Sequence, residues 1–139
     1  MSTSSPSAPA SSVPPAPDVP TRRLLVKITT GAEAPERYSQ GVTVAATALA
    51  TGAQVSLWLT GEATWLVVPG RAEELSLPFS APLADLRDVL LAEATVTVCS
   101  QCAARRELTE ADLLPGARIA GAASFVEEAL APGVQALVY

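Results

Sequence analysis

The sequence predicts an α/β protein: a single domain with three layers, α/β/α, built on a mostly parallel sheet of five strands. Short β-branched segments bounded by glycine or proline alternate with helix-like segments from about residue 22 to the end of the chain. The chain shows no internal repeat, and its 139 residues are enough for one domain. Regular alternation of strands and helices is typical of parallel sheets that carry helices on both faces.

Residues 1–21 are not expected to belong to this domain. They are nearly all Ser, Pro, Ala and Thr, and their only bulky apolar side chains are Val13 and Val19. Because this composition buries too little surface to offset the entropy lost on ordering, we predict a disordered tail. The segment also lacks the basic start and continuous apolar stretch of a secretory signal. The folded domain is therefore predicted to span residues 22–139.

The predicted elements follow one another with short connections. The first strand covers residues 23–30 and stops at Gly31, and a helix opened by Pro35 continues to Gly52. Further strands are predicted at 53–59, 94–98, 117–120 and 134–138. Further helices are predicted as a short segment through Trp65 and Val68, at 82–92, as a short segment after Cys102, and at 124–131.

Two of these helices carry informative patterns. Between residues 82 and 92 leucines recur at helical spacing, and the charged side chains of Asp85, Arg87 and Asp88 are predicted to point outward. The segment 42–50 is small and apolar nearly all round, which fits close packing between a sheet and a neighbouring subunit. It is one reason to expect a homo-oligomer, a trimer or a multiple of one.

The most informative residues are Cys99 and Cys102, the only cysteines of the chain. Alternating Thr and Val before them is typical of a buried strand, and the residues after them are typical of the first turns of a helix. Cys99 is therefore predicted at a strand–helix junction, with backbone N–H groups, Arg105 and Arg106 nearby. That setting favours the thiolate over the thiol. Since the chain has no histidine, the sulfur atoms are its best candidates for chemistry.

In a parallel α/β domain the loops that follow the strands meet at one edge of the sheet, and sites form there. This edge is predicted to collect residues 31–35, 60–62, 99–102 and 121–124. Glu62 is consequently a candidate acid or base near the thiol, although a turn carboxylate is more often only solvated. Trp58 and Trp65 are expected to fill the core rather than line a site.

Composition argues against several classes of function. A formal net charge of −5 without a basic stripe disfavours binding to nucleic acid or to anionic membrane surfaces, and no segment has the length and purity of a membrane span. We expect a cytoplasmic protein, where a Cys-x-x-Cys is more often reactive or metal-binding than a structural disulfide. Zinc requires four ligands, which only two chains pooling their cysteines would supply, so no metal and no cofactor are predicted. Haem attachment is excluded because residue 103 is Ala, and no phosphate-binding glycine motif is present.

The stretch around the cysteines resembles the active-cysteine region of the DsrE-like family. It has a strand ending in Cys99, two variable residues, a small-residue stretch and the pair Arg105 and Arg106. Family-like order extends over residues 24–139. The family includes sulfur-relay subunits of bacterial tRNA thiolation and of dissimilatory sulfur oxidation. The resemblance implies an α/β/α fold, oligomeric assembly, sulfur donor and acceptor proteins as partners, and a persulfide carried on Cys99.

Two departures from the family pattern leave alternatives open. Cys102 stands where relay subunits commonly have a non-thiol residue, although other branches carry Cys-x-x-Cys, and Glu107 replaces a frequent glycine. Cys102 either resolves a modified Cys99 as a disulfide or packs beneath the loop. The competing functions are a small dithiol redox protein and a non-catalytic binding or scaffold subunit. The two arginines either stabilise the thiolate or form a solvated face that pairs with Glu107 or Glu110.

Overall fold

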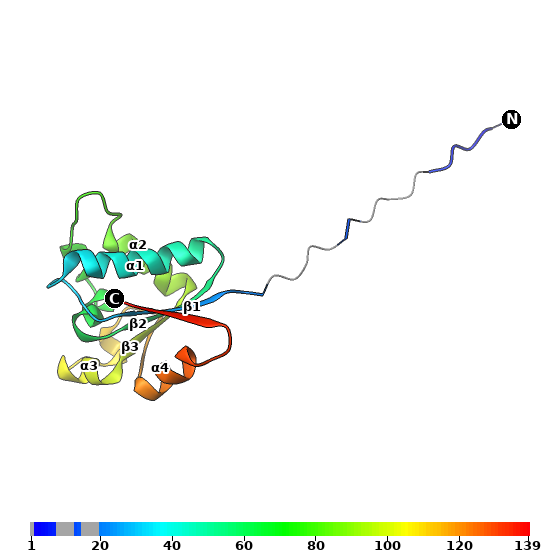
Figure 1. Cartoon of the computed structure of the whole chain (residues 1–139). Coiled ribbons are helices and arrows are strands. Elements are labelled where there is room, and N and C mark those ends of the chain that lie inside the picture. Colours follow the sequence, from blue (N-terminus) through cyan, green and yellow to red (C-terminus); the bar gives the residue numbers. More distant parts are fainter. Residues whose placement is uncertain (1, 8–12, 15–19) are drawn as a thin grey trace.

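The structure is a computed structural model that describes residues 2–7, 13–14 and 20–139. In this part of the chain one five-stranded sheet has the order β4-β3-β2-β1-β5, and helices cover both of its faces (Figure 1). The α/β class and the three layers are confirmed, and the sheet, predicted as mostly parallel, is parallel in every pair. The predicted disorder of residues 1–21 falls largely outside the described residues.

The strands are β1 (Arg23–Ile28), β2 (Gln54–Leu59), β3 (Thr95–Cys99), β4 (Ala117–Ala120) and β5 (Val134–Val138). The α-helices are α1 (Pro35–Ala50), α2 (Leu83–Glu93), α3 (Ser100–Arg105) and α4 (Ala122–Ala129). Short 3₁₀ helices are η1 (Gly61–Val67), η2 (Ala72–Glu74) and η3 (Glu110–Asp112). The order of elements agrees with the sequence prediction. The main shifts are that α3 starts directly after Cys99 and α4 starts at Ala122 rather than at Ser124.

The two faces of the sheet differ in chemistry. Alternate strand residues, among them Val26, Leu57 and Val98, are fully buried and belong to the apolar core beneath α1 and α2. The opposite face, covered by α3 and α4 (Figure 1), carries Trp58 and Thr97, which are also buried. The more polar of the two faces, which carries Thr97 of β3, is therefore the face next to the cysteines.

The apolar character of helix segment 42–50 is largely explained within the chain. Val42, Ala45 and Ala46 of α1 are buried, whereas Thr43 and Thr47 are exposed. The helix thus has an apolar face toward the core and a face of small polar residues toward solvent. The homo-oligomer stays a prediction, and this helix no longer supplies a reason for it.

The prediction that Arg87 points outward is wrong. Its side chain on α2 is buried, and its Nη2 lies 2.8 Å from Oε1 of Glu73. Its Nε donates a hydrogen bond of 3.0 Å to Oδ1 of Asp88. Because η2 packs against α2, it brings a carboxylate to a helix face that the helical pattern alone would assign to solvent. The charged head is neutralised there while the aliphatic stem is buried.

Candidate functional site

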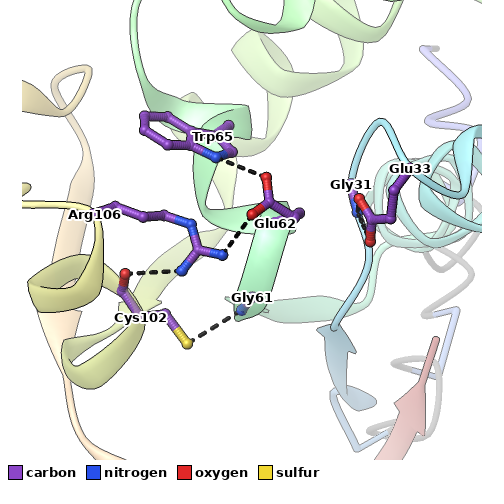
Figure 2. Close-up of polar contacts among 7 residues, drawn as sticks. All are labelled: Gly31, Glu33, Gly61, Glu62, Trp65, Cys102 and Arg106. Atoms are coloured by element: carbon purple, nitrogen blue, oxygen red, sulfur yellow. Dashed lines mark hydrogen bonds and ion pairs between the residues drawn. The ribbon is translucent and has the colours of Figure 1, made fainter.

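The loops after four strands meet at the carboxyl edge of the sheet, as predicted. A Cβ atom added to Gly31 would lie 2.5 Å from the backbone oxygen of Glu62, so these two loops are in close contact. The N–H of Gly61 donates to Sγ of Cys102 at 3.1 Å, which joins the loop after β2 to α3 (Figure 2). A Cβ added to Gly121 would lie 3.4 Å from Oγ of Ser100, which brings in the loop after β4.

Cys99 occupies the N-cap position of α3 with extended backbone angles, φ −61° and ψ 127°. Its thiol is partly buried. Burial raises its pKa, but hydrogen bonds from the backbone N–H of Cys102, the side chain of Cys102 and the backbone N–H of Gln101, together with the charge of Lys27, outweigh it. The pKa of Cys99 is therefore lower than that of an ordinary cysteine. The thiolate, which is the nucleophilic form, is favoured.

Cys102 lies in the first turn of α3, and only 7% of it is exposed. Both cysteines are free thiols. The Cys102 sulfur accepts the N–H of Gly61, and the Cys102 side chain also lowers the pKa of Cys99. The two cysteines lie close together, and the less exposed one favours ionisation of the other.

Lys27 is the cation that acts on Cys99, and sequence reasoning missed it. It faces the same side of the sheet as Trp58, its register partner on β2. Its Nζ lies 4.7 Å from the ring centroid of Phe125, and that ring packs edge-on against Trp58 at 5.4 Å. A lysine between the apolar residues Val26 and Ile28 of the predicted first strand was the available signal.

The two arginines, predicted either to stabilise the thiolate or to form a solvated face with an ion pair, differ in environment. Arg105 is exposed. Nη2 of Arg106 lies 2.8 Å from Oε1 of Glu62, and its Nη1 donates to the backbone oxygen of Cys102 at 3.0 Å (Figure 2). Arg106 thus pairs with Glu62, not with Glu107 or Glu110, and ties η1 to α3.

Glu62 is held on both of its oxygens. The hydrogen bond from Arg106 is the largest cause of its lowered pKa. Partial burial opposes this lowering, and a 2.9 Å hydrogen bond from Nε1 of Trp65 adds to it. Glu62 therefore stays ionised near neutral pH. This arrangement suits a residue that positions the cysteine loop better than one that exchanges protons with the thiol.

The two tryptophans differ in environment. Trp58 is buried, as predicted, whereas Trp65 is only partly buried, and the guanidinium of Arg71 lies 4.1 Å from its ring centroid.

Within residues 2–7, 13–14 and 20–139, no helix is long and apolar enough to cross a membrane. In the same part of the chain, no group of three or more His, Cys, Asp or Glu side chains is arranged to hold a metal ion.

The fold and the site together describe an α/β protein with a parallel sheet and a cysteine of lowered pKa at a strand–helix junction. Residues 22–136 match the model of the DsrE/DsrF-like family, so the chain belongs to that family, which is generally linked to sulfur relay. No curated protein matches the chain significantly.

Two solved structures are similar in fold. The crystal structure of the ychN protein from E. coli has a TM-score of 0.69 and 15% sequence identity, and the match covers 86% of this chain and 99% of that one. The protein of unknown function MTH1491 from Methanobacterium thermoautotrophicum has a TM-score of 0.65 and 10% identity, with 85% and 99% covered. At this level of identity the likeness concerns the fold alone.

Proposed function

We propose that the protein accepts sulfane sulfur as a persulfide on Cys99 and passes it on. The observation that carries the proposal is the place of Cys99 at the N-cap of α3, where the backbone N–H groups of Gln101 and Cys102 lower its pKa despite partial burial. The same donors suit a persulfide, which is also anionic near neutral pH. Membership of a family linked to sulfur relay supports the same chemistry.

The loading step is a thiol exchange. The Cys99 thiolate attacks the outer sulfur of a donor persulfide, R–S–SH, the donor S–S bond breaks, and the donor leaves as R–S⁻. The product is Cys99–S–SH, and no net oxidation occurs. A thiolate on an acceptor protein then removes the outer sulfur in the same way. We assign this exchange to donor and acceptor proteins in the cytoplasm, where thiols are kept reduced.

Cys102 is proposed as a resolving thiol. Once deprotonated, its sulfur attacks the inner sulfur of the Cys99 persulfide, forms the Cys99–Cys102 disulfide and expels HS⁻. A dithiol reductant then supplies two electrons to restore both thiols. The closeness of the two cysteines and the burial of Cys102 support this role, because external thiols reach Cys99 more readily than Cys102.

Single substitutions separate these roles. Purified protein is reduced, freed of reductant and incubated with a low-molecular-weight persulfide, and its intact mass is measured by mass spectrometry. Cys102→Ser is expected to gain the mass of one sulfur atom, wild type to gain it only until Cys102 expels sulfide, and Cys99→Ser to gain none. Equal gain by Cys99→Ser and Cys102→Ser rules out the assignment to Cys99.

The lifetime of the persulfide tests the resolving step. Cys102→Ser is expected to hold the added sulfur longer and to release less sulfide than wild type, because the internal attacking thiol is gone. An unchanged lifetime, with no Cys99–Cys102 disulfide after mild oxidation, makes Cys102 a packing residue. Alkylation of Cys99 at neutral pH no faster than that of a free cysteine model would instead favour the non-catalytic subunit.

A further inference from the structure

A cavity of about 260 Å³ lies at the amino ends of the strands, the edge of the sheet opposite to the cysteines. The strand register places its lining side chains on the face that carries Trp58 and that α4 covers (Figure 1). Every strand contributes its first or second residue to the lining: Arg23, Gln54, Thr95, Arg118 and Val134. The cavity is therefore separate from the site around Cys99.

Glu128 of α4 is the acidic side chain of this lining, and both of its oxygens are occupied. Its Oε2 accepts the hydroxyl of Ser56 at 2.6 Å and Nε1–H of Trp58 at 2.9 Å. Its Oε1 lies 2.7 Å from Nη2 of Arg118. Because its charge is offset by an arginine and its oxygens are already hydrogen-bonded, Glu128 is poorly suited to hold a cationic ligand.

The same network fixes the orientation of Arg118. Its Nε donates to Oγ1 of Thr97 at 2.8 Å, and its Nη2 donates to Glu128. A guanidinium has five N–H groups in a rigid plane, so these two hydrogen bonds leave three for a ligand. A guanidinium that is oriented before the ligand arrives is well suited to bind a carboxylate.

The other polar side chains of the lining supply further donors. Arg23 forms no ion pair with a carboxylate of residues 2–7, 13–14 and 20–139. Gln54 and Thr95 are exposed, and the amide of the first and the hydroxyl of the second can both donate hydrogen bonds. Two arginines against one glutamate give this lining an excess of one positive charge, in a chain whose net charge is −5.

We propose that this cavity binds a small dicarboxylate, with one carboxylate on Arg118 and the other on Arg23. The two arginines stand on β4 and β1, which β3 and β2 separate, so a ligand with an anionic group at each end uses both. A single inorganic oxyanion bound to one of them leaves the other without a partner. The donors of Gln54 and Thr95 lie on the strands between the arginines.

The size and the apolar part of the lining restrict the ligand further. The cavity is smaller than the pockets of drug-sized ligands, which measure roughly 300–1,000 Å³, so it admits a chain of only a few carbon atoms. The side chains of Leu25 and Val134 also line it, and they suit the methylene groups between two carboxylates. The proposal is independent of the sulfur chemistry at Cys99.

The test is isothermal titration calorimetry of the full chain at low ionic strength, where exposed charges are least screened. Succinate and glutarate are the probes, and acetate and sulfate are the comparison ions. Arg23→Gln and Arg118→Gln each remove one of the two proposed carboxylate partners. Arg22→Gln is the matched control, because the charge change is the same and Arg22 does not line the cavity.

Wild type, Cys99→Ser and Arg22→Gln are expected to bind succinate or glutarate with the same affinity. Arg23→Gln and Arg118→Gln are expected to bind roughly tenfold more weakly, as for the loss of a charge-assisted hydrogen bond. Arg23→Gln carries the test if Arg118→Gln fails to fold, because Arg23 is exposed and Arg118 also holds Glu128. No saturable binding of either dicarboxylate, an equal loss in Arg22→Gln and Arg23→Gln, or binding of acetate or sulfate as tight as that of the dicarboxylates overturns the proposal.

Discussion

Replacement of Gly61 by alanine is expected to lower the free energy of unfolding by about 2 to 4 kcal/mol. Gly61 has φ +54°, and a Cβ atom there would lie 2.7 Å from the backbone oxygen of Thr29. The left-handed conformation alone costs a non-glycine residue about 1–2 kcal/mol. The contact adds to this cost because it involves a backbone oxygen, which no side-chain rotation can move away.

Gly70→Ala is the matched control for this prediction. Gly70 also has a positive φ, +82°, but a Cβ atom there would meet nothing within 4 Å. Urea denaturation of both variants therefore separates the conformational cost from the cost of the contact. Equal losses of stability in the two variants would contradict the close packing of the loops after β1 and β2.

Gly61→Ala also has an expected effect on the site. The N–H of Gly61 donates to Cys102, so a shift of this loop weakens the bond and exposes the sulfur. Cys102 is consequently expected to react faster with an alkylating reagent in folded Gly61→Ala than in folded Gly70→Ala, as followed by mass spectrometry of the digested protein. Equal rates would show that Gly61 has only a structural role.

The fold could be predicted because its signals are local. Alternating Thr and Val in the segment before Cys99, and a helix-like segment immediately after it, fix a strand–helix junction without reference to the rest of the chain. Because parallel strands place their carboxyl ends at one edge, the meeting of the loops at Gly31, Gly61 and Cys99 followed from the order of elements.

The partners of the charged side chains could not be predicted in the same way. Arg87 is buried because η2 brings Glu73 to α2, and the pattern within α2 contains no trace of that contact. The two arginines nearest to Cys99 in sequence were predicted either to stabilise its thiolate or to form a solvated face that pairs with Glu107 or Glu110, and Arg106 pairs with Glu62, a residue of another loop. Nearness in sequence is a poor guide at this edge, since each loop there belongs to a different strand.

Lys27 therefore provides a direct test of the electrostatics of the site. Lys27→Met is expected to raise the pKa of Cys99, because a positive charge that favours the thiolate is removed. At a neutral pH below the pKa of the variant, a smaller fraction of Cys99 is ionised, and alkylation slows by roughly threefold. Methionine keeps a long flexible chain against Phe125, so the packing of α4 is largely retained.

The measurement is the rate of Cys99 alkylation as a function of pH, made in the Cys102→Ser background so that one thiol reacts. The curve of Lys27→Met is expected to shift to higher pH while its plateau at high pH stays close to that of the parent, because the fully ionised thiolate is the same nucleophile.

Lys27→Arg keeps the charge and is expected to restore the parental curve. Arg105→Gln is expected to leave it in place, since Arg105 is exposed and is not among the groups that lower the pKa of Cys99. A shift with Arg105→Gln as large as that with Lys27→Met would return the role to the arginine, and a lower plateau without a shift would mean that Lys27 supports the packing of the site and not its charge.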